Sequence, residues 1–286
     1  MTGLALALVL AAAFIHAAWN LLAKRASGDA TFTWLFAVWS AVLYAPVAAG
    51  VIFRRQAHLG LTEIGFMAGS AILHTAYFLL LNQGYRFGDL SLVYPLARGT
   101  GPLLSCTAAI VFLGERPSAL ALAGALLITA GVVILTGRLH HFREAQARTA
   151  VIYAFITGTL IAGYTLWDKQ AVGQVSMSPI LLDWGANLGR AVLLTPMAVA
   201  RWKRVRAEWR NHRFEALGVA ILTPLSYILV LTALAFTAVT YIAPAREISI
   251  LIGAAMGTGL LAEGDAARRI GAAFAMVLGV VALAVG

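Results

Sequence analysis

The sequence predicts an all-α membrane protein with ten transmembrane helices, arranged as two inverted five-helix repeats. Three observations lead to this fold class: an apolar composition, a division into long apolar blocks, and the recurrence of unusual residues at one fixed offset. The first two define the class, and the third defines the arrangement.

Apolar side chains dominate the composition. They make up 61% of the 286 residues, charged side chains make up only 12%, and the mean hydropathy is +0.85. A soluble domain does not carry so much apolar surface. A bilayer core about 30 Å thick requires about 20 apolar residues per helix. The chain divides into ten such blocks, at 3–23, 31–53, 61–82, 89–113, 118–137, 149–168, 178–200, 214–236, 240–261 and 267–285. The first block is expected to be helix one and not a cleaved signal, because no basic residue precedes it and nine blocks follow.

The basic residues favour a lipid partner. The formal net charge is +9, and the basic side chains gather in joints between blocks, above all in RWKRVRAEWRNHR at 201–213. Anionic lipid headgroups are therefore the expected partner, and nucleic acid is not. By the positive-inside rule, the distribution places both termini outside the cytoplasm. The single cysteine, Cys106, excludes an intramolecular disulfide, and no ligand spacing suggests a metal. We expect no cofactor and a monomeric chain.

A repeat appears when the sequence is shifted by 148 positions. The shift places His16, Trp19 and Asn20 on Tyr164, Trp167 and Asp168, Arg98 on Arg246, Glu115 on Glu263, and Gly131 on Gly279. A single offset that pairs so many uncommon residues indicates a duplication. We therefore expect repeats at 1–137 and 149–286, joined by a loop at 138–148. Because five is odd, the second repeat runs inverted through the membrane, as in many secondary transporters.

Two embedded arginines form the most unusual repeat pair. Arg98 lies in YPLARGTGP and Arg246 in IAPAREISI, and the flanking prolines and glycines are expected to loosen both helices. An arginine in the bilayer costs at least about 2.5 to 3.5 kcal/mol, so it should face the bundle interior and have a partner. One interpretation is an internal ion pair with Glu247 or Asp183. The other is a site that holds a substrate carboxylate or phosphate.

Further polar residues follow helical spacing. His16 and Asn20 share a face of the first block, and Asp183, Asn187 and Arg190 share a face of the seventh. For Arg190, the favoured interpretation is an intrahelical pair with Asp183 bridged by Asn187. Either histidine is interpreted as a satisfied core residue or as a proton carrier.

The candidate site residues follow from these patterns. Tyrosines in the helices that carry embedded charges would enclose an apolar part of the substrate. Trp19, Trp167 and Asp168 have the alternative interpretation of interface residues. The substrate-binding candidates are His16, Trp19, Asn20, His74, Tyr77, Tyr94, Arg98, Tyr164, Trp167, Tyr227, Tyr241 and Arg246. The candidates for proton relay or ion pairing are His16, His74, Asp183 and Glu247. No motif of a membrane protease or hydrolase is present, so no catalytic residue is assigned and an enzyme is not expected.

Several segments resemble the drug/metabolite transporter superfamily, specifically its ten-helix EamA-type group. They are FLGERPS at 112–118, the weaker counterpart LLAEGDA at 260–266, GALLITAGVVIL at 124–135 and HAAWNLLAK at 16–24. The resemblance implies a central cavity formed by helices one, three, four, six, eight and nine, with alternating access. It also implies export of amino acids or related metabolites across the bacterial inner membrane. Both termini would then be cytoplasmic, against the charge count.

The function expected from the sequence is that of a secondary transporter of small amino-acid-like or organic-acid metabolites. Proton coupling through the histidines or carboxylates is one form of this mechanism. An exchanger or importer of phosphorylated or phosphonate-type compounds is the alternative, because arginines also suit phosphate. A passive channel or lipid scramblase is the alternative of another class.

The glycines at 124, 131, 271 and 279 are expected to pack helix backbones closely.

Overall fold

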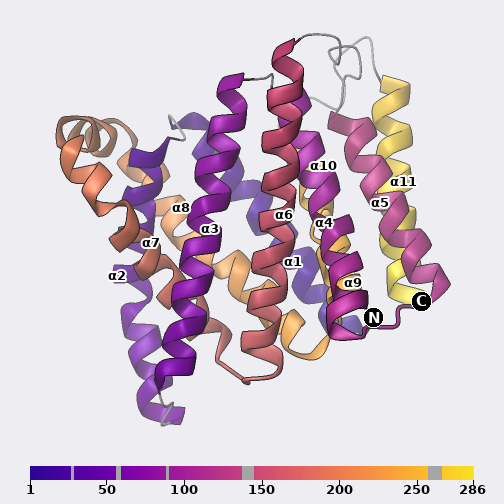
Figure 1. Cartoon of the computed structure of the whole chain (residues 1–286), viewed down its shortest axis with the longest axis horizontal. Helices are drawn as coiled ribbons and strands as arrows, with labels where there is room; N and C mark the ends of the chain where they lie inside the picture. Colours follow the sequence, from indigo (N-terminus) through magenta and orange to yellow (C-terminus); the bar gives the residue numbers. More distant parts are fainter. Residues whose placement is uncertain (27–28, 56–58, 88–89, 137–144, 257–265) are drawn as a thin grey trace.

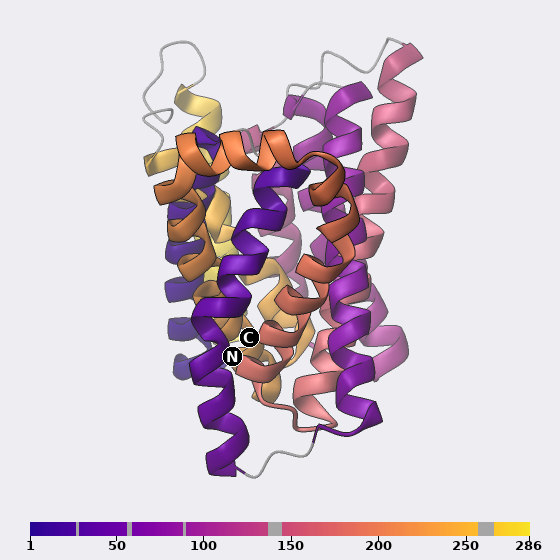
Figure 2. The ribbon, with the colours of Figure 1, turned by 90° about the vertical axis from the view of Figure 1, so that its left-hand side faces the viewer.

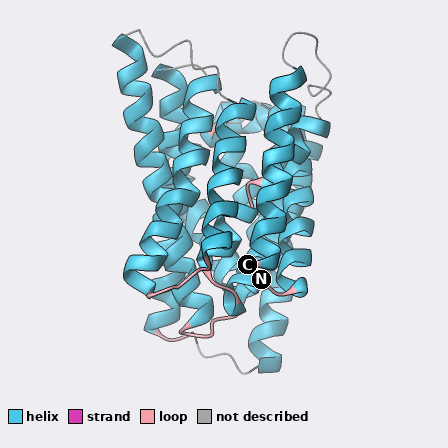
Figure 3. Ribbon diagram, turned by 90° about the vertical axis from the view of Figure 1, so that its right-hand side faces the viewer, coloured by secondary structure: helices cyan, strands magenta, loops and turns pink. Residues whose placement is uncertain are grey.

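The computed structural model is a bundle of helices that run side by side (Figure 1). It describes residues 1–26, 29–55, 59–87, 90–136, 145–256 and 266–286, and within these ranges it contains no strand (Figure 3). The helices are α1 (Gly3–Arg25), α2 (Ala30–Arg55), α3 (Leu61–Phe87), α4 (Leu90–Leu113), α5 (Ala119–Thr136), α6 (Ala145–Gly173), α7 (Pro179–Ala200), α8 (Trp202–Phe236), α9 (Val239–Ala245), α10 (Ile248–Met256) and α11 (Ala266–Val285). The all-α class is therefore confirmed.

The distribution of side chains suits a lipid environment. Within the described residues, six helices are long and apolar enough to cross a membrane, and two shorter apolar helices lie at Ala119–Ile134 and Ile270–Val285. Large apolar residues such as Phe14, Phe53 and Phe274 are exposed, whereas many fully buried residues are alanines. Lipid is as apolar as the helix surface, so the hydrophobic effect does not drive helices together in a membrane. Small residues instead let helix backbones pack closely. The number of spans, ten, stays a prediction.

The two arginine segments differ in backbone. α4 is one continuous helix around Arg98, so the expected loosening there is wrong, although Gly99, Gly101 and Pro102 follow it. In the other segment the loosening is confirmed: α9 ends at Ala245, one residue after Pro244, and α10 begins at Ile248. Over its described residues, the ninth block is therefore two short helices with Arg246 and Glu247 at their junction.

The basic stretch is helical, which corrects its assignment to a joint. Residues from Trp202 form the first segment of α8, and the backbone leaves helical geometry at His212. This segment lies across one end of the bundle (Figure 2). Arg204 pairs with Asp29, just before α2, at 2.7 Å. Burial alone raises the Asp29 pKa, but hydrogen bonds from Thr31 and the Phe32 backbone, with the Arg204 charge, hold that pKa below its ordinary value.

The helices pack in a few close pairs, and the inverted repeat stays a prediction. α1 packs on α8 and α10, while α6, its counterpart at the 148-residue offset, packs on α3 and α4. α2 packs on α7, and α5 packs on α11. In the α5–α11 contact, a Cβ built on Gly124 would lie 2.6 Å from the Gly279 carbonyl oxygen. Gly131 also faces α11 closely, but among the described residues nothing lies within 4 Å of a Cβ on Gly271, so the packing role expected for Gly271 is wrong.

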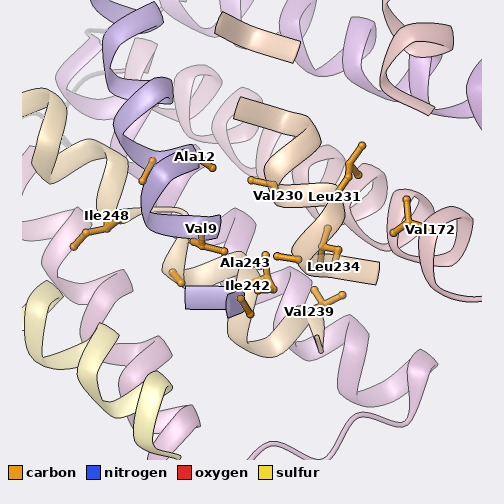
Figure 4. Close-up of a cluster of buried hydrophobic side chains, with 14 of the residues drawn as sticks. Val9, Ala12, Val172, Val230, Leu231, Leu234, Val239, Ile242, Ala243 and Ile248 are labelled. Carbon is orange, nitrogen blue, oxygen red and sulfur yellow. The ribbon is translucent and has the colours of Figure 1, made fainter. Parts of the chain in front are cut away.

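The two chain termini lie together at the other end of the bundle. The Met1 amino group donates to the carbonyl oxygens of Leu283 at 3.5 Å and Ala284 at 3.4 Å. Just inside this end, fully buried apolar side chains from α1, α8 and α9 pack against one another, among them Val9, Leu234 and Ile242 (Figure 4). This cluster fills the space between the helices.

At the same end of the bundle, the Glu115 carboxylate binds the backbone where α9 follows α8. The two Glu115 oxygens accept hydrogen bonds from the backbone N–H groups of Val239 at 2.7 Å and Thr240 at 2.9 Å. Lys169 Nζ donates to the carbonyl oxygens of Leu234 at 2.7 Å and Thr237 at 3.0 Å, where α8 ends. The negative Glu115 thus meets the N–H groups at the start of α9, and the positive Lys169 meets the carbonyl groups at the end of α8. Each charge has the sign that the helix end favours.

Candidate functional site

A cavity of about 180 Å³ lies between the helices. It is lined by Ala12, Ala13, His16, Trp19, Ala23, Phe32, Thr33, Phe36, His74, Tyr77, Phe78, Arg98, Tyr164, Asp183, Ala186, Asn187, Arg190, Thr223, Ser226, Tyr227, Val230 and Arg246. Along α1 the lining runs from Ala12 to Ala23, which is toward the end covered by the basic segment of α8. The apolar cluster of Figure 4 closes the cavity toward the chain termini.

Arg98 is engaged in an ion pair between α4 and the α9–α10 junction. Its Nε lies 3.0 Å from Glu247 Oε2, and both side chains are buried. The sequence alone left open which arginine Glu247 pairs with. The partner is the distant Arg98 and not the adjacent Arg246. Successive residues at the junction point apart, so Glu247 faces α4 while Arg246 faces the cavity.

Arg246 lies among aromatic rings. Its Nη2 donates to the Tyr164 hydroxyl at 3.3 Å, and its guanidinium carbon lies 6.0 Å from the Tyr164 ring centroid and 5.8 Å from that of Tyr227. Within the described residues no carboxylate lies within ion-pair distance of Arg246. Aromatic faces stabilise a desolvated cation without neutralising it. The guanidinium thus retains donors for an anion.

Asp168 is the most enclosed charge of the site. Its side chain is fully buried, and its Oδ2 lies 3.2 Å from His74 Nε2 and accepts a hydrogen bond from the Tyr227 hydroxyl at 2.5 Å. Its Oδ1 is buried with no hydrogen-bond partner among the described residues. The His74 ring stacks on Tyr164 with centroids 4.0 Å apart and meets Tyr227 edge-on at 5.1 Å. Histidine and carboxylate thus share the two tyrosines that surround Arg246.

The polar face of α7 forms a chain along the cavity wall. Asn187 Nδ2 donates to Asp183 Oδ2 at 3.1 Å, and Arg190 Nη1 donates to Asn187 Oδ1 at 3.2 Å. The bridging of Asp183 and Arg190 by Asn187 is therefore as the spacing predicts. Both charged side chains nevertheless line the cavity.

Most of the candidate residues come together, and some do not. His16, Trp19, His74, Tyr77, Arg98, Tyr164, Tyr227, Arg246 and Asp183 line the cavity. Asn20 lies off it, because its Nδ2 donates back to the His16 carbonyl oxygen at 2.9 Å. The side chain of Tyr94 lies outside the described part of the chain.

Two aromatic candidates point elsewhere. Trp167 Nε1 donates to the Phe66 carbonyl oxygen at 2.9 Å, and the residue is 38% exposed beside α3, so it does not line the cavity. Tyr241 lies near the chain end, where its hydroxyl donates to the Gly286 carbonyl oxygen at 3.3 Å. Its position two residues into α9, at the sealed end, explains why it does not reach the cavity.

The structure also adds residues that the sequence patterns did not assign to the site. Asp168, taken from sequence as either a lining or an interface residue, is not itself among the lining residues but contacts two of them, His74 and Tyr227. Its spacing of four from Tyr164 on α6 was the available signal. Phe32 and Phe36 bring α2 into the lining, beyond the helices that the family resemblance implies. Within the described residues, no three histidine, cysteine or acidic side chains are placed to hold a metal ion.

Comparison with known proteins identifies the type of protein. Residues 3–137 match the EamA-like transporter family. The match lies within the first half of the chain, which is therefore similar to this family. Together, this match and the apolar helices indicate a multi-pass membrane protein. No curated protein matches it.

Solved structures share the fold of this chain over both halves. One of them, titled only "Crystal structure of protein", shares 14% sequence identity and superposes with a TM-score of 0.73. The match covers 98% of this chain and 97% of the other. At that identity the likeness concerns the fold, which the second half therefore shares.

Proposed function

We propose that this protein is a secondary transporter of small organic acids and amino-acid-like metabolites that works by alternating access. The observation that carries the proposal is the Arg246 guanidinium in a cavity between the halves, held by two tyrosines and without a carboxylate partner among the described residues. A carboxylate is the natural ligand for such a fork of donors.

The rest of the lining supports a substrate with an apolar body. Trp19, Phe32, Phe36 and Phe78 line the cavity around the charged groups. Sites for small molecules combine mainly apolar walls with a few placed polar groups. Export across the bacterial inner membrane is the direction that the family resemblance implies.

The sealed end supports a carrier over a passive channel. A channel requires a continuous path, whereas fully buried side chains such as Val9 and Ile242 close the bundle on the side of the termini. The paired packing of α1 with α8 and α6 with α3 supports the inverted repeat that alternating access uses.

Counterflow in proteoliposomes tests the proposal. Vesicles loaded with one unlabelled solute would receive a radiolabelled panel of amino acids, dicarboxylates and phosphate esters. We expect saturable accumulation of a carboxylate-bearing solute, and we expect Arg246→Gln to abolish it while Arg246→Lys retains part of it. Accumulation of phosphate esters alone would favour the exchanger of phosphorylated compounds. Equal transport by Arg246→Gln and the unaltered protein would contradict the proposed role of this arginine.

A further inference from the structure

The buried pair of His74 and Asp168 has no role in anion binding as described so far. Asp168 is fully buried, its Oδ2 contacts both His74 and Tyr227, and its Oδ1 has no partner among the described residues. A buried carboxylate with an unsatisfied oxygen is costly, and binding a proton lowers that cost. The pair thus places an oxygen without a partner among the described residues next to a histidine, the side chain that most readily exchanges a proton near neutral pH.

We propose that the His74–Asp168 pair binds one proton together with a monoanionic organic acid on Arg246, so that acid and proton cross the membrane in the same direction. The inference rests on the proposed function and deepens it. It names both the substrate charge and the second ligand.

The first argument for coupling a proton to the acid is the charge balance of the site. Among the described side chains in and next to the cavity, Arg98, Arg190 and Arg246 are matched by three carboxylates, Asp168, Asp183 and Glu247. The empty site is thus formally neutral when both histidines are neutral. A bound monoanion would leave one uncompensated negative charge in a medium of low dielectric constant, which is unfavourable. One proton restores neutrality.

The second argument is that the proton site and the anion site lie close together. Tyr164 contacts both groups: it stacks on His74 at 4.0 Å and accepts a hydrogen bond from Arg246. Tyr227 likewise donates to Asp168 and lies under the Arg246 guanidinium at 5.8 Å. Proton and anion sites are therefore joined through two shared side chains. Opposite charges at sites this close favour each other's binding, and the effect is reciprocal.

Other charged and titratable groups also act on the pair, from α3 and from α7. Tyr77 lies on the same helix as His74, Arg190 faces the pair from α7, and Asp183 faces Asp168 from α7. In the empty site, Arg190 and Arg246 oppose a further positive charge on His74. An anion on Arg246 removes part of that opposition. Occupancy by the acid therefore controls proton binding.

Infrared difference spectroscopy of the full chain in lipid tests the proton site without any substrate. Between about pH 5 and about pH 8, the protein should gain either the carbonyl stretch of a neutral carboxyl or, with ring-labelled histidine, an imidazolium signal. Asp168→Asn should remove the first signal and His74→Gln the second. Glu63→Gln, which alters a carboxylate at the start of α3 outside the cavity, is the matched control. Identical difference spectra for the unaltered protein and both pair variants would overturn the proton site.

A second arm tests the coupling with 3-phenylpropionate as the probe. Saturating probe should strengthen proton binding by about tenfold, the ordinary range of coupling between sites. The uncharged 3-phenylpropanol and the Arg246→Gln variant should give no such change. Probe binding, followed by calorimetry, without a change in the titration would overturn the coupling. A pair that titrates in a protein that binds no carboxylate would overturn the proposed carrier function and leave the proton site in place.

Discussion

The two repeat-related arginines share a chemical group but have different surroundings. Arg98 on α4 faces Glu247 at 3.0 Å, whereas Arg246 at the α9–α10 junction faces two tyrosines. A buried ion pair holds its members in place, and a cation among aromatic rings keeps its donors for a ligand. The first arginine therefore has a structural role, and the proposed substrate contact belongs to the second.

Replacing Arg98 should destabilise the protein. Arg98→Gln leaves the buried Glu247 carboxylate without its guanidinium, and removal of one partner of such a pair costs about 3 to 5 kcal/mol. We expect a lower melting temperature in detergent, measured by thermal shift. Adding Glu247→Gln should recover most of the loss, because no charge is then left unpaired. A single variant as stable as the unaltered protein would show that the pair is not holding the junction.

At the scale of elements, the α5–α11 contact depends on the absence of side chains. Gly124 and Gly279 face each other, and a Cβ on Gly279 would lie 2.7 Å from the Gly124 carbonyl oxygen. The backbone oxygen cannot move without shifting its helix. Close approach at this point is therefore required by the packing.

We expect Gly279→Ala to separate α5 from α11. Overpacking of this kind costs about 1 to 3 kcal/mol, measured as a fall in thermal stability. Gly271→Ala, on the same helix but with nothing within 4 Å of the added methyl group, is the matched control. That control should be neutral or slightly stabilising, because alanine favours helix over glycine. Equal effects of the two substitutions would contradict the packing argument.

The Gly114–Glu115 turn has a physical role at the sealed end. Gly114 adopts a φ of +67°, a region that favours glycine, and this turn brings the Glu115 carboxylate to the first N–H groups of α9. A carboxylate at a helix N-terminus is stabilised by both hydrogen bonds and the helix dipole. The contact thus ties the first half of the chain to the second.

Glu115→Gln should loosen this end of the bundle. The neutral amide loses the charge and one of two acceptors, at a cost of about 1 to 2 kcal/mol. Cys106, the only cysteine, is buried with its Sγ 3.7 Å from the Thr240 carbonyl oxygen, so it reports on the joint directly. We expect faster labelling of Cys106 by a maleimide. Glu63→Gln, at the start of another helix, should leave the labelling rate unchanged; faster labelling there too would point to a general loss of stability.

At the scale of the whole molecule, charge is concentrated across one end. On the first segment of α8, Lys203, Arg206 and Arg210 are exposed at helical spacing, while Val205 and Glu208 face the bundle. The Trp209 ring stacks on Trp39 of α2 with centroids 5.1 Å apart. A basic face above a bundle that spans lipid suits anionic headgroups.

Anionic lipid should therefore stabilise the protein through this segment. In nanodiscs containing phosphatidylglycerol, we expect a higher melting temperature than in phosphatidylcholine alone. The gain in binding free energy to the lipid is about 1 kcal/mol per basic side chain near the surface. Replacing Lys203, Arg206 and Arg210 together by glutamine should remove most of the difference. Arg54→Gln with Arg116→Gln, exposed at other helix ends, is the control. A lipid effect that survives the triple replacement would assign it to other parts of the surface.

The sequence by itself determined the helical class and the membrane setting, because composition and block length depend only on which residues are apolar. It also indicated the break at Arg246 and Glu247, since proline removes a backbone donor, but the same reasoning failed for α4, which continues through Pro102. Spacing on one helix likewise indicated the Asp183–Asn187–Arg190 chain. These features are local, and local chemistry fixes them.

Only the tertiary structure decided which embedded charges meet. The pairing of Arg98 with Glu247, the contact of Asp168 with His74 and the aromatic surroundings of Arg246 join helices far apart in the chain. The outward position of Trp167, beside the inward Asp168, depends on the rotation of α6 against α3. Such contacts depend on how whole helices pack, and helix packing in lipid is set by shape at many small residues at once, which no single stretch of sequence encodes.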